Sequence, residues 1–180
     1  VLWKQKHDGR VQPVNEEDEY AMYAHTLDRL EQVGLPAYEI SNFSAPGHEC
    51  RHNLVYWAND PYFGVGLGAA RFVDGTRAVN TRDLKSYVKR MESGLDPTGP
   101  IEQLDPEAHA RETAVLMLRR LQLGLSRRDF TERTGMELDA LVGDMLTRHV
   151  SKGWLEDDGE RLRLTRSGLF VADTVMADFL

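Results

Sequence analysis

The chain has little of several features that mark familiar protein classes. Cys50 is the only cysteine among its 180 residues, which excludes an internal disulfide framework and predicts a reducing compartment. The sequence contains no run of about eighteen apolar residues, so it predicts no membrane-spanning helix. Its first residues also lack the basic, apolar and small-residue pattern of a signal peptide. We therefore expect a cytoplasmic protein.

Positive charge is also scarce. The sequence has 22 Lys and Arg residues against 29 Asp and Glu residues, a formal net charge of −7 at pH 7. A nucleic-acid-binding surface is normally basic, so we expect no nucleic-acid partner. With 41% hydrophobic residues the chain can bury a core, and its length fits one or two domains.

The hydrophobic pattern of the first half predicts helices alternating with strands, as in an α/β protein. Asn15 is placed to cap a helix over 15–34, and residues 37–42 alternate as a strand does. An Asp-Gly turn predicts a hairpin over 72–79. A further helix is expected over 80–94.

A segment rich in proline and glycine at 95–100 reads as a linker, so we place a domain boundary there, with domains over 1–97 and 98–180. The second domain is expected to contain three helices, a two-stranded hairpin and a closing helix, which is a winged-helix arrangement. From residue 101 onward, 11 Lys and Arg residues stand against 15 Asp and Glu residues, so a phosphate backbone would be repelled. We interpret this domain as a packing or docking module.

The stretch over 46–57 is rich in side chains that bind metals or flat aromatic ligands. It holds two imidazoles, the single thiol and two aromatic rings, from His48, Cys50, His52, Tyr56 and Trp57. Such groups suit a metal ion or a tetrapyrrole. If the segment is extended, His48, Cys50 and His52 share one face. The stretch directly follows a predicted strand end, where ligands gather in α/β folds.

The residues alone leave two interpretations of this stretch open. Structural zinc normally takes four ligands, and no second His or Cys pair lies at a fitting distance in the sequence. In the simpler interpretation, His48 is therefore an exposed side chain and Cys50 only packs against its neighbours. Asn53 can hydrogen-bond locally. The two aromatic residues either fill a core within an irregular strand, or form a wall for a flat ligand with His52 as its axial group.

A glycine-rich segment follows at 64–70. Gly64-x-Gly66-x-Gly68 lacks the Lys-Ser/Thr of a P-loop and the strand–turn–helix context of a dinucleotide-binding fold. Closely spaced glycines instead permit tight backbone approach. The sequence also contains no Gly-x-Ser-x-Gly elbow and no His-Glu-x-x-His pair, so neither hydrolase class is predicted.

The run YEISNFSAPGHECRHNLVYW over 38–57, followed by GVGLGA over 64–69, resembles one family. It is similar to the oxygen-independent coproporphyrinogen III oxidase-like radical SAM proteins, and within them to the HemW, or haem chaperone, branch. The Leu123-Gly124-Leu125 and Leu164-Thr165-x-x-Gly168 segments look like the C-terminal domain of that family.

The resemblance implies a fold of the α+β and α/β class. It would be the C-terminal portion of a partial (β/α)6-type radical SAM barrel, followed by the winged-helix-like domain. Members of the family carry a [4Fe–4S] cluster on a Cys-x-x-x-Cys-x-x-Cys motif and use S-adenosylmethionine. Cys50 alone cannot hold that cluster, so we interpret the chain as the C-terminal part of such a protein and expect it to be inactive by itself.

The resemblance also assigns roles to the stretch over 46–57. His52, Asn53, Tyr56 and Trp57 form the HNxxYW motif that the family links to haem binding. His52 is then the candidate iron ligand, with Cys50 as a weaker second candidate, and the aromatic rings contact the macrocycle.

Phe43 and Ser44, at the end of the last barrel strand, would by resemblance approach S-adenosylmethionine. The function implied is haem binding or transfer in porphyrin and haem metabolism. One alternative is oxidative decarboxylation of coproporphyrinogen III through a 5′-deoxyadenosyl radical, and another is a non-catalytic winged-helix interaction module. The expected partners are haem or a porphyrin, haem-accepting proteins, a membrane only through such acceptors, and a second copy meeting the open strand edge of an incomplete barrel.

Overall fold

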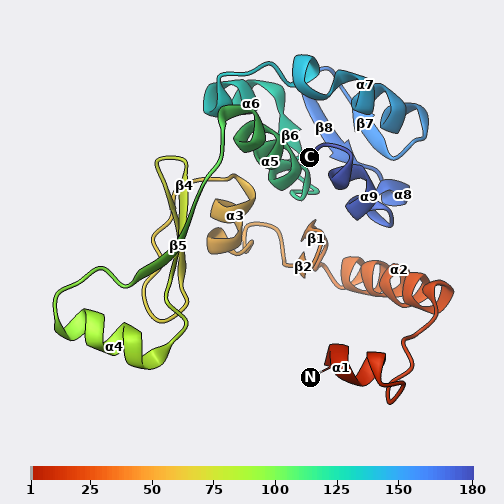
Figure 1. Cartoon of the computed structure of the whole chain (residues 1–180). Coiled ribbons are helices and arrows are strands. Elements are labelled where there is room, and N and C mark those ends of the chain that lie inside the picture. Colours follow the sequence, from red (N-terminus) through yellow and green to blue (C-terminus); the bar gives the residue numbers. More distant parts are fainter. Residues whose placement is uncertain (1) are drawn as a thin grey trace.

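The computed structural model describes residues 2–180, and it arranges them in two regions (Figure 1). The first region, residues 2–103, contains α1 (Leu2–His7), α2 (Glu16–Gln32), β1 (Ala37–Glu39), β2 (Asn42–Phe43), α3 (Arg51–Trp57), β3 (Ala70–Val73), β4 (Thr76–Asn80), α4 (Leu84–Glu92) and β5 (Thr98–Gln103). The second region, residues 104–180, contains α5 (Pro106–Leu118), β6 (Leu125–Ser126), α6 (Arg127–Thr134), α7 (Leu138–Ser151), β7 (Leu155–Asp157), β8 (Arg161–Leu164), α8 (Arg166–Leu169) and α9 (Ala172–Ala177).

Local sequence signals account for several elements of the first region. The side chain of Asn15 accepts a hydrogen bond from the backbone N–H of Asp18 at 2.8 Å, which confirms the predicted cap of α2. Asp74 and Gly75 both have positive φ, 51° and 70°, as a type I′ turn requires, and they join β3 to β4 as expected. The cap of α4 lies slightly later than predicted, at Asp83.

Two predictions for the first region are wrong in detail. Residues 37–42 do not form one strand: β1 and β2 pair antiparallel around a tight turn, because the buried carboxylate of Glu39 accepts the backbone N–H of Ser41 at 2.9 Å. The segment expected as a linker also contributes a strand, since β5 begins at Thr98 and pairs with β4. Pro100 is tolerated there because β5 is an edge strand of the sheet, whose order is β3-β4-β5.

The second region has the helices and the hairpin that the sequence predicts. Asp105 caps α5 by accepting the backbone N–H of Ala108 at 2.9 Å, with Pro106 at the first helical position. Strands β6, β8 and β7 form a three-stranded sheet in that order. The expected closing helix is divided into α8 and α9, because Val171 leaves the helical conformation, with φ −120° and ψ 22°.

The main hydrophobic core lies in the second region. Its buried members come from every helix and strand of that region except α8 and from Phe179 after α9. The largest fully buried ones are Phe130, Phe179, Met117, Leu118 and Leu125. Among the described residues, no helix is both long enough and apolar enough to cross a membrane.

Helix α3 lies between the β3–β5 sheet and the second region (Figure 1). Residues that follow α3 contact α5 directly, because the side-chain N–H of Asn59 donates to the hydroxyl of Thr113 at 2.9 Å. The main chain also joins the regions, since the N–H of Leu121 donates to the carbonyl of Tyr38 at 3.1 Å. The fold thus packs α3, an element of the first region, against α5 of the second region.

Candidate functional site

The candidate site is built on α3, which carries the whole HNxxYW motif. His52 and Tyr56 are four residues apart, so they lie one above the other on the same face of the helix. Their ring centroids are 4.7 Å apart and the rings meet edge to face. His52 is exposed and Tyr56 is half-buried. This face therefore presents an accessible imidazole beside an aromatic ring.

The expectation that His48, Cys50 and His52 share one extended face is wrong. His48 follows a turn in which Gly47 has a φ of 81°, and Cys50 is the residue immediately before α3 begins. The period of two that would align the three side chains is therefore lost at Arg51, where the helix starts. In the part of the chain that the structure describes, no group of three or more His, Cys, Asp or Glu side chains is placed to hold a metal ion.

The other two motif residues lie on a different face of α3 and anchor it. The side-chain N–H of Asn53 donates to the hydroxyl of Tyr38 at 3.1 Å, and Tyr38 is buried. Trp57 lies under Arg119, whose guanidinium carbon is 4.2 Å from the centroid of the indole. The motif thus divides into two helical pairs. His52 is exposed and contacts Tyr56, which is half-buried against Tyr62, while Asn53 and Trp57 hold the helix in place.

A row of rings continues from Tyr56 into the neighbouring sheet. The ring of Tyr62 is 4.4 Å from Tyr56 and 6.4 Å from Phe72, and Phe72 stacks on His109 of α5 at 5.7 Å. The sequence alone did not identify Tyr62, Phe72 or His109 as part of this row of rings. The only signal was the clustering of aromatic residues around the glycine segment.

The glycine-rich segment supports this row by close backbone packing. A Cβ on Gly64 would lie 2.0 Å from the carbonyl oxygen of Ala70, so only glycine fits there. Side chains alternate along the segment, and Phe63 and Val65 are 81% and 92% exposed. This agrees with the interpretation of the glycines as sites of close backbone approach.

Phe43 is the last residue of β2 and Ser44 follows it, and both are half-buried. The Oγ atom of Ser44 is buried without a hydrogen-bond partner among the described residues, so its hydroxyl suits a polar ligand group. A [4Fe–4S] cluster held by the three-cysteine motif does not fit this chain, because Cys50 is its only cysteine.

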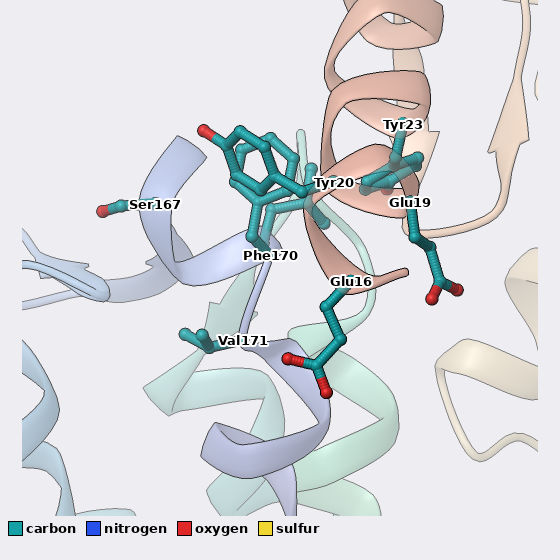
Figure 2. A pocket seen from close by; sticks show the side chains of 8 residues that line it. Glu16, Glu19, Tyr20, Tyr23, Ser167, Phe170 and Val171 are labelled. Atoms are coloured by element: carbon teal, nitrogen blue, oxygen red, sulfur yellow. The ribbon is translucent and has the colours of Figure 1, made fainter. Parts of the chain in front are cut away.

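A hollow of about 640 Å³ lies away from α3, between the start of α2 and the junction of α8 and α9. Figure 2 shows the ring of Phe170 beside Tyr20, with the carboxylates of Glu16 and Glu19 nearby. The ring centroids of Tyr20 and Phe170 are 4.2 Å apart. The sequence predicted an exposed acidic helix start here but no hollow, because its second wall comes from residues about 150 positions later.

Comparisons with known proteins agree with this arrangement. The HemN C-terminal domain matches residues 104–171. The haem chaperone HemW of Bacillus subtilis is 33% identical over 180 residues, which is 100% of this chain and 47% of that protein. The HemW of Synechocystis is 33% identical over 175 residues, covering 96% of this chain and 42% of its own length. The chain therefore spans about half the length of these relatives.

Among solved structures, the coproporphyrinogen III oxidase HemN of Escherichia coli, described as a radical SAM enzyme, superposes with a TM-score of 0.70. That match covers 92% of this chain and 42% of HemN at 14% sequence identity, so it shows the fold alone. The matched domain and the similar relatives agree with the class of coproporphyrinogen III oxidase-like radical SAM proteins. Within that class, the chain is similar over its length to the HemW proteins, and residues 104–171 match the HemN C-terminal domain.

Proposed function

We propose that this chain binds haem on the outer face of α3, with the imidazole of His52 as an axial ligand of the iron. The observation that carries the proposal is the exposed His52 ring, held edge to face against Tyr56 at 4.7 Å on an anchored helix. Haem iron takes one or two axial ligands from a protein, so a single accessible imidazole is sufficient. The lack of a three-ligand metal group among the described residues does not conflict with haem, whose other iron ligands are supplied by the porphyrin.

The remaining motif residues have distinct roles in this proposal. Tyr56 offers an aromatic ring to the macrocycle. Cys50, exposed at the residue before α3, is a second axial candidate. Asn53 and Trp57 act through the helix, because their partners Tyr38 and Arg119 lie behind it. Haem is then cargo that is passed to an acceptor protein.

We extend the proposal to a larger protein of the HemW type. There, residues outside this chain would hold the [4Fe–4S] cluster, and Phe43 and Ser44 would approach S-adenosylmethionine at the end of a partial barrel. This chain alone would be catalytically inactive. The second region would be a winged-helix module, formed by α5, α6 and α7 with the β6–β8–β7 sheet. We place the boundary between two domains near residue 104, a few residues later than the sequence indicated, because β5 pairs with β4 of the first region.

A haem titration followed by absorbance tests the proposal. The unmodified protein should give a Soret shift that saturates near one equivalent. His52→Ala should weaken binding by about tenfold or more, because it removes an iron ligand. His48→Ala is the matched control, since it removes an exposed imidazole just before α3, and it should bind as the unmodified protein does. No saturable shift in the unmodified protein, or equal binding by all three, would contradict the proposal.

A further inference from the structure

Arg119 connects the two regions at the back of α3. It follows the last residue of α5, and its guanidinium reaches out of the second region into the first. One nitrogen lies 3.4 Å from a carboxylate oxygen of Glu39, and the guanidinium carbon lies 4.2 Å from the centroid of Trp57. One side chain of the second region therefore contacts both β1 and α3.

Glu39 gives Arg119 a fixed point of attachment. Its side chain is fully buried, at 0% exposure, and one of its oxygens accepts hydrogen bonds from the backbone of Ser41 and the side chain of Asn42. The other oxygen faces Arg119. A buried carboxylate requires such a cationic partner, because an unpaired charge away from water is strongly unfavourable. The same site raises the pKa of Tyr23, through burial first and then through the carboxylate of Glu39.

The indole of Trp57 transmits this attachment to α3. A helix of seven residues is too short to be stable alone, so its orientation depends on tertiary contacts. Planar stacking of a guanidinium on an indole is among the strongest cation–π contacts. His52 lies near the start of the same short helix and Trp57 at its end, so the position of His52 depends on that of the indole.

We infer that Arg119 is a positioning residue, through which the second region fixes Trp57 and thereby sets the affinity of the His52 face for a tetrapyrrole. The inference rests on the proposed haem site. The second region then contributes to haem binding, although its residues lie far from His52 in the sequence.

Haem titration of Arg119 variants is the first test. Arg119→Met should weaken haem binding by about tenfold. Arg119→Lys should restore part of the affinity, because it keeps the charge but replaces the flat guanidinium with a compact ammonium group. Gln122→Ala is the matched control, because Gln122 also reaches from the second region to β1, where its side chain donates to the carbonyl of Ala37 at 3.3 Å. It should leave haem affinity unchanged.

A double-mutant cycle separates positioning from general destabilisation. If Arg119 acts through His52, then Arg119→Met should have no further effect on haem affinity in a His52→Ala background. Additive losses would overturn the inference. Since Arg119→Met leaves Glu39 buried and unpaired, the pair Glu39→Gln with Arg119→Met is tested as well. This pair should still bind haem weakly, and normal binding would also overturn the inference.

A measurement without haem distinguishes this inference from the proposed function. Fluorine NMR of protein labelled with 5-fluorotryptophan reports on each of the 3 tryptophans, and Trp57→Phe assigns one signal. Arg119→Met should shift and broaden the Trp57 signal and leave that of Trp154 in place. An unchanged Trp57 signal overturns the positioning role. A changed signal in a protein that binds no haem overturns only the haem site.

Discussion

The two regions of this molecule differ sharply in how they place apolar side chains. Of the described residues, those buried and hydrophobic include only five from the first region, namely Leu27, Tyr38, Ala58, Phe72 and Ala78, whereas all the others belong to the second. The large hydrophobic side chains that are exposed have the opposite distribution. Among the described residues, only Leu123, Val150 and Leu180 of this group come from the second region, and the others belong to the first. The second region has a core of its own, while the first keeps its apolar surface available for other contacts.

This difference suits a division of roles. A continuous core makes the second region a stable platform. The first region carries α3, the exposed Phe63 and Val65, and short strands, so its elements depend more on neighbours than on burial. We therefore expect substitutions in the second region to change the free energy of unfolding, and substitutions at α3 to change binding.

The largest expected difference is between two phenylalanines. Phe130 is fully buried, so Phe130→Ala should lower the free energy of unfolding by about 3–5 kcal/mol. Phe63 is 81% exposed, so Phe63→Ala should change it by less than about 0.5 kcal/mol. Chemical denaturation followed by circular dichroism measures both. Similar losses from the two variants would remove the distinction between the regions.

A smaller effect is expected from the ionic network inside the second region. Arg127 binds both carboxylate oxygens of Asp139 and both of Asp157, at 2.7–3.0 Å. Arg127→Met should therefore cost about 1–2 kcal/mol. One of the ion pairs between the regions, Arg166 with Asp28, is half exposed on both sides. Arg166→Met should cost less than about 1 kcal/mol, and a larger loss from this variant than from Arg127→Met would contradict the comparison.

The same network predicts an acid-dependent loss of stability. Hydrogen bonds from Arg127 hold the pKa of Asp139 and that of Asp157 below their usual range. Their stabilising contribution is complete above the unfolded pKa of about 3.9 and is lost as the pH falls through the lower folded values. This effect falls between about pH 5 and pH 2. Over that range, the free energy of unfolding of Arg127→Met should fall less steeply with decreasing pH than that of the unmodified protein. An unchanged acid profile would exclude the network as its source.

The smallest expected effect comes from His149 at near-neutral pH. Its side chain is fully buried against Trp154, and burial lowers its pKa despite the nearby carboxylate of Asp178. The neutral ring makes its full contribution to the free energy of unfolding above the pKa of the unfolded state, about 6.5. This contribution is lost as the pH falls through the lower pKa of the folded state. His149→Phe should flatten this part of the stability profile. A steeper profile in the variant would mean that the ring is charged in the fold.

Local signals made much of the fold predictable. The caps at Asn15 and Asp105 and the Asp74-Gly75 turn depend on neighbouring residues, so the sequence shows them directly. The extended interpretation of the stretch around His52 failed because α3 is held by distant partners. Tyr38 precedes α3 by more than ten residues, and Arg119 follows it by more than sixty.

The candidate site was predictable in its residue types and not in its division into two faces. The motif identified His52 and Tyr56, but periodicity did not show that Asn53 and Trp57 face inward. That division depends on the contact between Trp57 and Arg119, and no local pattern encodes a contact across so long a separation.

The most direct test of the account is a ligand exchange at His52. We would record the absorbance and electron paramagnetic resonance spectra of the ferric haem complex of the unmodified protein and of His52→Cys. We expect the Soret band and the resonance signals to change from those of an imidazole-ligated iron to those of a thiolate-ligated one, because His52 supplies the axial ligand. Identical spectra from the two proteins would show that the iron is held elsewhere and would contradict the account.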